Sequence, residues 1–189
     1  LKVLITGDAI LDEFTFCEIM EKSGKTDLIT TKYKQSETQL GGIFAIANHL
    51  ADFVNNVKLI TVVGSNDLGR IFEGVDKRVD NSSFIQYGEK TIVKKRYVDK
   101  YTGKKMFEIY NTEELQTSSE NEEKIKKTID QASSEFDLII VADFGHGMIT
   151  QGIIDQLSKF TGCLSINCQL NGGNMGYNFI TKYNRADFV

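Results

Sequence analysis

Apolar runs of strand length alternate along this chain with segments whose apolar positions follow a helical spacing. The runs KVLITGDAI, VKLITVVG, DLIIVADFG and CLSINCQ are strongly apolar, which is typical of strands that are buried on both faces. Helical spacing is found over 42–54, 67–75, 118–136 and 150–160. Asp67 and the serines at the start of 118–136 are suitable helix caps. The alternation predicts an α/β fold with a parallel central sheet flanked by helices.

Two segments, 14–40 and about 84–111, interrupt this alternation. They are polar and alternate in places, as exposed strands do. Within the second segment, TIVKKRYVD and KKMFEIYN are separated by KYTG, so they are predicted to form a β-hairpin. We therefore expect a single domain over 1–189 in which these two segments build a small β-sheet that projects as a lid.

Composition narrows the class of protein. The chain is 41% hydrophobic and 25% charged, which suits one globular domain, and its net charge of −4 comes without a basic block, so nucleic acid is not an expected partner. No apolar run is long enough to span a bilayer and no secretory signal is visible, so a cytoplasmic protein is expected. The three cysteines (Cys17, Cys163 and Cys168) have neither metal-ligand spacing nor a disulfide framework, and no metal site is predicted.

Polar residues follow the predicted buried strands at the points where each strand ends. Asp8 and Asp12 follow the first strand, Asp143 follows LIIVA, and Asn167 lies in CLSINCQ. Ligands of open α/β sheets bind at the carboxyl ends of the strands, and an ionised carboxylate accepts hydrogen bonds from neighbouring hydroxyls. These residues are therefore candidates for binding a ligand rich in hydroxyl groups. The alternative is that they cap helices and turns.

Gly41 and Gly42 precede the predicted helix at 42–54, without the spacing of a dinucleotide fingerprint or a P-loop. They offer free N–H groups and close backbone approach to an oxygen-rich ligand, or they form only a helix-entry turn. Arg96 lies on the predicted hairpin with Lys94 on its face and Lys95 on the other, so it could hold a phosphate or guard a strand edge. His49 and His146 suit a helix surface and a turn better than a metal site.

Five stretches follow one another in a recognisable order: KVLITGDAILDEF, LGGIFAIANHLA, VKLITVVGSNDLGRIF, TIVKKRYVD and DLIIVADFGHGMIT. Over essentially its whole length, the chain resembles the ribokinase-type (PfkB) carbohydrate kinases, and within them the D-glycero-D-manno-heptose 7-phosphate kinase branch. The resemblance implies a ribokinase-like sheet with a β lid and transfer of the ATP γ-phosphate to a sugar hydroxyl with Mg²⁺. It also implies a homodimer through the lid.

The same resemblance implies roles for particular residues. Asp12 would hold sugar hydroxyls, Gly41 and Gly42 would let the sugar approach the backbone, Arg96 would hold the substrate, and Asp143 would border the pocket. The chain departs from the heptose kinase pattern in the Gly-Gly helix, at His146, where that branch usually has Lys, and at Asn167, which occupies the place of a strand-end Asp. A branch that acts on another sugar phosphate therefore stays open.

The family's G-x-G-D motif, which carries its catalytic Asp, does not occur in the sequence, and NRADFV offers only Asn184 and Asp187 at a spacing similar to its Asn-x-x-Glu motif. We therefore expect this chain to be the sugar-binding portion of a longer kinase, without the C-terminal part of the fold and without a catalytic residue. ATP and Mg²⁺ are then expected to bind the full-length enzyme and not this chain alone. The alternatives are a non-catalytic module that binds a sugar phosphate or dimerises through the lid, and a nucleotide-binding α/β domain.

Overall fold

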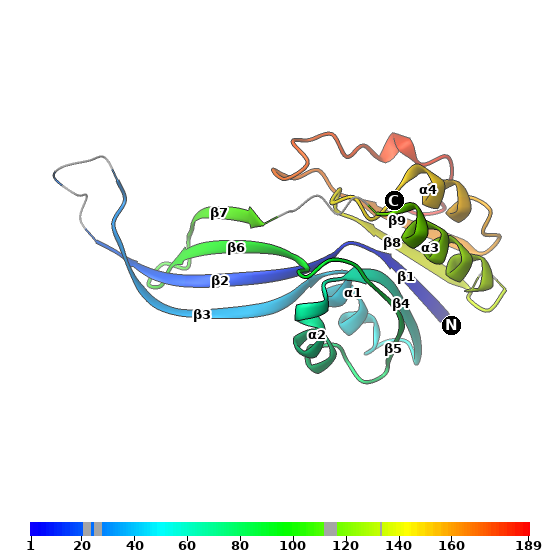
Figure 1. Cartoon of the computed structure of the whole chain (residues 1–189), viewed down its shortest axis with the longest axis horizontal. Coiled ribbons are helices and arrows are strands. Elements are labelled where there is room, and N and C mark those ends of the chain that lie inside the picture. The colour runs from blue at the N-terminus through cyan, green and yellow to red at the C-terminus, as the bar shows by residue number, and fades with distance from the viewer. Residues whose placement is uncertain (21–23, 25–27, 112–116, 133) are drawn as a thin grey trace.

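The core of the molecule is a five-stranded parallel sheet with the strand order β5-β4-β1-β8-β9 (Figure 1). The computed structural model describes residues 1–20, 24, 28–111, 117–132 and 134–189. The strands are β1 (Lys2–Gly7), β4 (Asn56–Val63), β5 (Val79–Gln86), β8 (Leu138–Asp143) and β9 (Cys163–Cys168). Their apolar side chains cover both faces of the sheet, as the continuous apolar runs predict.

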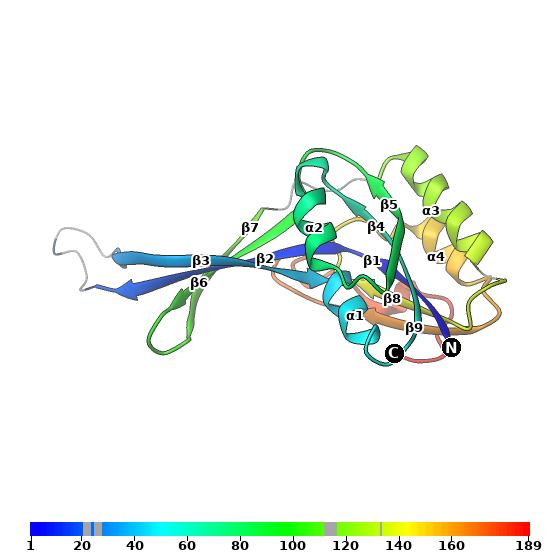
Figure 2. The ribbon, with the colours of Figure 1, turned by 90° about the horizontal axis from the view of Figure 1, so that it is seen from below.

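Helices cover both faces of this sheet. The helices α1 (Ile43–Leu50) and α2 (Leu68–Gly74) pack with Val3 and Ile5 in one buried cluster. The helices α3 (Ser119–Ala132) and α4 (Gln151–Leu157) pack with Leu4 in the other, and Figure 2 shows the two helix pairs on opposite sides of the sheet. Short 3₁₀ turns occur at Ser65–Asp67 and Ile180–Lys182. None of the helices in the described ranges is long and apolar enough to cross a membrane.

A second sheet of four strands, the lid, extends from one end of the core as a long arm (Figures 1 and 2). Its strand order is β3-β2-β6-β7. The outer pairs, β3 with β2 and β6 with β7, are antiparallel, and the central pair, β2 with β6, is parallel. The strands are β2 (Ala9–Ile19), β3 (Thr31–Gly42), β6 (Ile92–Asp99) and β7 (Lys105–Asn111). Only Asp8 separates β1 of the core from β2 of the lid.

The strand boundaries differ from the predicted segments at two places. The run KVLITGDAI is divided at Asp8, so the lid begins at Ala9, and residues 84–86 belong to β5 of the core instead of the lid. The Asp67 side chain does not cap α2 but accepts a hydrogen bond from the Thr91 N–H at 2.7 Å, whereas Ser118 caps α3 through the Asn121 N–H at 3.2 Å. The predicted segments also include 21–23, 25–27 and 133, which lie outside the described residues.

Candidate functional site

Three of the predicted site residues meet on one face of the lid. We call this the Asp12 face; it carries Asp12, Lys94, Arg96, Glu108 and Tyr110, which the register of the strands β2, β6 and β7 places side by side. The Arg96 guanidinium forms an ion pair with the Asp12 carboxylate, and its Nε lies 3.6 Å from Glu108 Oε1. A Cβ added to Gly41 would lie 2.1 Å from Asp12 Oδ2. The Asp12 carboxylate, oriented by Arg96, therefore lies in the space that a side chain at position 41 would fill.

The opposite side of the lid, the Glu13 face, carries a second charge pair. Lys95 Nζ lies 3.5 Å from Glu13 Oε2. Glu13 and Lys95 are paired across β2 and β6, one position after the pair formed by Asp12 and Lys94. The predicted alternation of Lys94, Lys95 and Arg96 is thus confirmed. The pairs Asp12–Arg96 and Glu13–Lys95 involve adjacent residues of the same two strands but lie on opposite faces of the lid. A substitution in the second pair is therefore a matched control for the same substitution in the first.

Lys94 is buried on the Asp12 face, with 6% of its surface exposed. Its Nζ lies 5.3 Å from the centroid of the Tyr110 ring and 5.7 Å from that of Phe144. No carboxylate in the described part of the chain lies within ion-pair distance of this ammonium group. Burial lowers the pKa of Lys94 below its usual value, and the neighbouring Arg96 lowers it further.

Gly42 connects the lid to α1 in a conformation that glycine tolerates best. Its φ is +54°, and an added Cβ would lie 2.5 Å from the backbone oxygen of Asp8. That oxygen also accepts a hydrogen bond from the Ile43 N–H at 3.2 Å, so the start of α1 is held against the junction between β1 and β2. The two glycines therefore have different neighbours: Gly41 adjoins the Asp12 side chain, and Gly42 adjoins the backbone of Asp8.

Alanine at these two positions is expected to have different effects. In Gly42→Ala, the new Cβ meets backbone at positive φ, so we expect the free energy of unfolding to fall by about 2–4 kcal/mol. In Gly41→Ala, the Cβ meets only the end of the Asp12 side chain, so a loss below about 1 kcal/mol is expected. Urea denaturation of both variants measures the difference. Equal losses in the free energy of unfolding would contradict the different roles of the two glycines.

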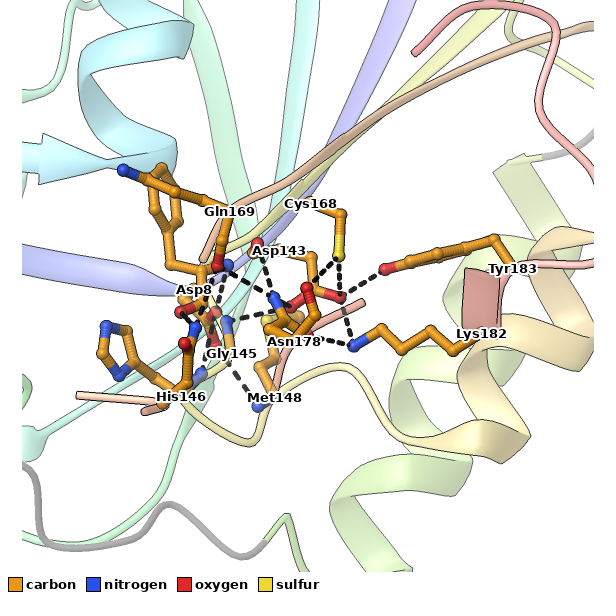
Figure 3. A network of polar contacts seen from close by, with 12 residues as sticks. Asp8, Asp143, Gly145, His146, Met148, Cys168, Gln169, Asn178, Lys182 and Tyr183 are labelled. Carbon is orange, nitrogen blue, oxygen red and sulfur yellow. Dashed lines mark hydrogen bonds and ion pairs between the residues drawn. The ribbon is translucent and has the colours of Figure 1, made fainter. Parts of the chain in front are cut away.

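The Asp8 carboxylate holds the turn that follows β8 (Figure 3). Its Oδ2 accepts hydrogen bonds from the backbone N–H of Phe144 at 2.8 Å and of His146 at 3.3 Å, and its Oδ1 accepts one from Met148 N–H at 3.3 Å. Burial raises the pKa of Asp8 to about 6, with a further contribution from Asp143, while the three N–H donors oppose the shift. The residue shapes the turn and has no free oxygen for a ligand among these contacts.

The Asp143 carboxylate lies at the end of β8 and is surrounded by protein donors (Figure 3). Its Oδ1 accepts from the Gly145 N–H at 2.9 Å and from Asn178 Nδ2 at 3.0 Å. Its Oδ2 accepts from the Tyr183 hydroxyl at 2.6 Å and pairs with Lys182 Nζ at 2.5 Å. Asp143 thus ties the segment that follows β9 to the turn at the end of β8. Sequence reasoning did not find Asn178, Lys182 and Tyr183, because they lie 35 to 40 positions away from it.

His146 is buried in the same turn, with 7% of its surface exposed. Its backbone N–H donates to Asp8, but its side chain extends away from the hydrogen-bond network (Figure 3), and its Nε2 has no hydrogen-bond partner in the described structure. Burial lowers the pKa of His146 to about 4, and the charge of Lys94 adds to this effect, while Asp143 opposes it. The turn was predicted, but burial of the imidazole was not.

His146 is expected to make the protein less stable as the pH falls. Because its pKa is about 4 when folded and 6.5 when free, the unfolded state binds more protons between these values. Its contribution is complete above pH 6.5 and decreases toward pH 4, a loss of about 2 kcal/mol at pH 5. The contribution of Asp8 to the pH dependence of stability has the opposite sign, because a carboxyl group with a raised pKa stabilises the folded state as the pH falls through about 6. Comparing denaturation of His146→Gln and the unmodified protein at pH 7.5 and 5 isolates the histidine. A pH-independent difference would contradict the prediction.

The other predicted site residue lies apart from these groups. Asn167 is exposed on β9 beside Ala142 of β8, and no contact joins it to the Asp12 face among the described residues. Within the described ranges, no group of three or more His, Cys, Asp or Glu side chains is arranged to hold a metal ion. The structure therefore brings together Asp12, Gly41 and Arg96, places Gly42 at the adjoining junction, and adds Lys94 and His146.

The chain is similar in sequence to curated bacterial proteins named bifunctional protein HldE. It is 23% identical over 161 residues to the one from Desulfatibacillum aliphaticivorans, with 84% of this chain and 32% of that protein covered. It is 22% identical over 194 residues to one from Campylobacter jejuni, with 100% of this chain and 39% of that protein covered. The chain thus spans about a third of the length of these relatives. No protein-family model matches it.

Solved structures give the fold. The Thermotoga maritima ribokinase superposes with a TM-score of 0.60 at 18% identity, over 88% of this chain and 52% of that one. Phosphofructokinase-2 from Escherichia coli, in complex with fructose-6-phosphate, superposes with a TM-score of 0.61 at 11% identity, over 87% of this chain and 54% of that one. The chain spans about half of each. It therefore has the ribokinase-type fold of sugar kinases, with sequence relatives that are named HldE.

Proposed function

We propose that this chain is the sugar-binding part of a ribokinase-type kinase that transfers the γ-phosphate of ATP to a hydroxyl of a sugar or sugar phosphate, with a heptose 7-phosphate-like compound as the favoured substrate. The observation that carries the proposal is the Asp12 carboxylate, which Arg96 orients on the lid against the backbone of Gly41. The sequence relatives and the fold support it.

The geometry suggests how these residues act. The ion pair with Arg96 holds Asp12 in one orientation, and its carboxylate accepts hydrogen bonds from two neighbouring sugar hydroxyls. The missing side chain of Gly41 leaves the space in which this carboxylate lies. Asp143 accepts a hydrogen bond from the Gly145 N–H and so orders the turn that carries His146, while its place at the border of a sugar pocket stays a prediction. Positioning of this kind contributes to phosphoryl transfer, which depends on holding the reactants in line.

ATP with Mg²⁺ would supply the phosphoryl group in the full-length enzyme. The described residues contain no cluster that fits a metal ion, so no residue of this chain is assigned to Mg²⁺ or to ATP. The predicted assignment of a catalytic base to a part of the protein outside this chain stays a prediction. A measurement of the intact mass of the native gene product, compared with the 21.2 kDa of this chain, tests it directly.

The proposed activity is tested by measuring ADP formation by the full-length protein. A panel of hexoses and heptoses, each with and without a phosphate, is supplied with Mg-ATP in a coupled assay. We expect ADP formation that depends on the added sugar. If no sugar on the panel stimulates ADP formation, the kinase proposal is wrong.

One observation favours the alternative of a module that dimerises through the lid. On the Glu13 face, Tyr97 and Phe107 stack with ring centroids 4.4 Å apart, and Phe107 and Ile109 are exposed. An exposed apolar patch of this kind is typical of an interaction surface. Sedimentation analysis of Phe107→Ser distinguishes the cases: a dimer that dissociates in this variant supports a lid interface, and an unchanged mass contradicts it.

A further inference from the structure

Two buried polar groups near the Asp12 face have no role in the proposed binding of sugar hydroxyls. Lys94 and His146 are 6% and 7% exposed. The Lys94 ammonium has only aromatic rings as close partners among the described residues, and His146 Nε2 has no hydrogen-bond partner there. His146 Nε2 is a buried polar atom without a hydrogen-bond partner, which is costly, and protonated lysine and histidine are both hydrogen-bond donors. Together they form a pair of donors suited to an anionic acceptor.

The two groups come from different segments and adjoin the same small region. Lys94 on β6 lies over the rings of Tyr110 at the end of β7 and of Phe144 after β8. A Cβ on Gly173 would lie 3.3 Å from His146 Cε1 and 3.6 Å from Tyr110 Cδ1, so the imidazole and the tyrosine ring adjoin one stretch of backbone. The charge of Lys94 also acts on His146.

Arg96 is less suited to an anion than its sequence pattern indicates. Its guanidinium is paired with Asp12 and lies beside Glu108, so two carboxylates already neutralise it. An additional anion at Arg96 would have to compete with both. Lys94 carries its charge with no carboxylate at ion-pair distance among the described residues, so it is the better cation for an anionic ligand.

We propose that Lys94 and His146 form the subsite for the phosphate group of a phosphorylated sugar, and that His146 takes up a proton from solvent when this group binds. The inference rests on the proposed function for the identity of the sugar, but not for the binding of the anion. The Lys94 ammonium pairs with the phosphate, and the protonated His146 donates its Nε2–H to a phosphate oxygen.

The coupling to a proton follows from the charges around the two groups. Lys94 faces Asp12, Asp8 and Glu108, which favour its charge, and Arg96, which opposes it; His146 faces Lys94 and Asp143. Burial and the Lys94 charge lower the pKa of His146 and so keep it neutral at pH 7. A bound phosphate group has about two negative charges at pH 7, which offset Lys94 and favour the imidazolium. Because the His146 midpoint is about 4 without the anion and is expected at about 5 or above with it, phosphate binding is expected to tighten as the pH falls from about 6 to 4.

The test follows the histidine Cε1–H signals of the full-length protein by NMR while inorganic phosphate is added. His146→Gln assigns the His146 signal, and His49 on α1 is the internal reference. We expect phosphate to shift the His146 signal and to raise its titration midpoint by at least about one pH unit, with no change at His49. Mannose 6-phosphate should produce the same shift, and unphosphorylated mannose should not.

Lys94→Met and Lys95→Met are the matched variants, since they remove neighbouring lysines on opposite faces of the lid. Phosphate affinity is expected to fall at least tenfold in Lys94→Met and to stay unchanged in Lys95→Met. The proposal is overturned if phosphate leaves the His146 signal in place, or if folded Lys94→Met binds phosphate as well as the unmodified protein. These results do not depend on turnover, so a kinase assay without activity would leave them intact and would count against the proposed function alone.

Discussion

Replacement of Asp8 by alanine is expected to lower the free energy of unfolding by about 3–5 kcal/mol at pH 7.5. The substitution removes the acceptor of three backbone N–H groups, those of Phe144, His146 and Met148, and leaves them without their partner in the turn after β8. The cost of burying the carboxylate itself, which raises its pKa to about 6, offsets part of this loss. Urea denaturation followed by circular dichroism measures the change.

Asp52→Ala is the control for this substitution. Asp52 is an exposed carboxylate that pairs with Arg78 at 2.8 Å, and its removal is expected to cost less than about 1 kcal/mol. Asp8→Asn keeps one acceptor oxygen and should fall between the two. If Asp8→Ala were no more destabilising than Asp52→Ala, other contacts would hold the turn, and Asp8 would not be the residue that shapes it.

Asp12→Ala in the full-length protein is expected to weaken sugar binding by at least about 100-fold. The substitution removes an ionised acceptor that is proposed to bind two hydroxyls, and each such hydrogen bond contributes about 1.5–3 kcal/mol. The fold should survive, because Asp12 lies on the lid and its main partner, Arg96, keeps Glu108 nearby. Isothermal titration calorimetry with the preferred sugar of the ADP assay measures the loss.

Glu13→Ala controls for any general effect on the lid. Glu13 is the next residue of β2, carries the same charge, and pairs with Lys95 on the opposite face. We expect its sugar affinity to equal that of the unmodified protein. The hydroxyl-binding role would be disproved if both variants lost affinity equally, and the capping alternative would be supported if Asp12→Ala unfolded while retaining affinity in its folded fraction.

The architecture of the core could be predicted from the sequence because its strands are buried on both faces. Continuous apolar runs mark β1, β4 and β8, and the helical spacing between them indicates crossover helices and hence parallel pairing. The strand β5 gave no such signal: VDNSSFIQ lies at the sheet edge with β4 as its partner, so its sequence is polar and mixed. The lid was recognised from its alternation.

The site could be predicted only where one strand determines it. The alternation of Lys94, Lys95 and Arg96 follows from the geometry of a single strand, and the structure confirms it. The parallel pairing of β2 with β6 depends on register, which local pattern does not give, and it is this pairing that brings Asp12 to Arg96. Burial of His146 likewise depends on segments that lie far away in the sequence.

The central position of β1 has a consequence for how the chain is made. One edge of β1 pairs with β4, in the register Val3 with Val57, and the other pairs with β8, in the register Val3 with Leu138. Lys2 and Asp137, which are hydrogen-bonded at that second edge, are 135 positions apart. At translation rates of about 5–20 residues per second, roughly 7–30 s separate the synthesis of these two residues. During that interval the edge of β1 that pairs with β8 has no partner strand, and an unpaired apolar edge favours aggregation and chaperone binding.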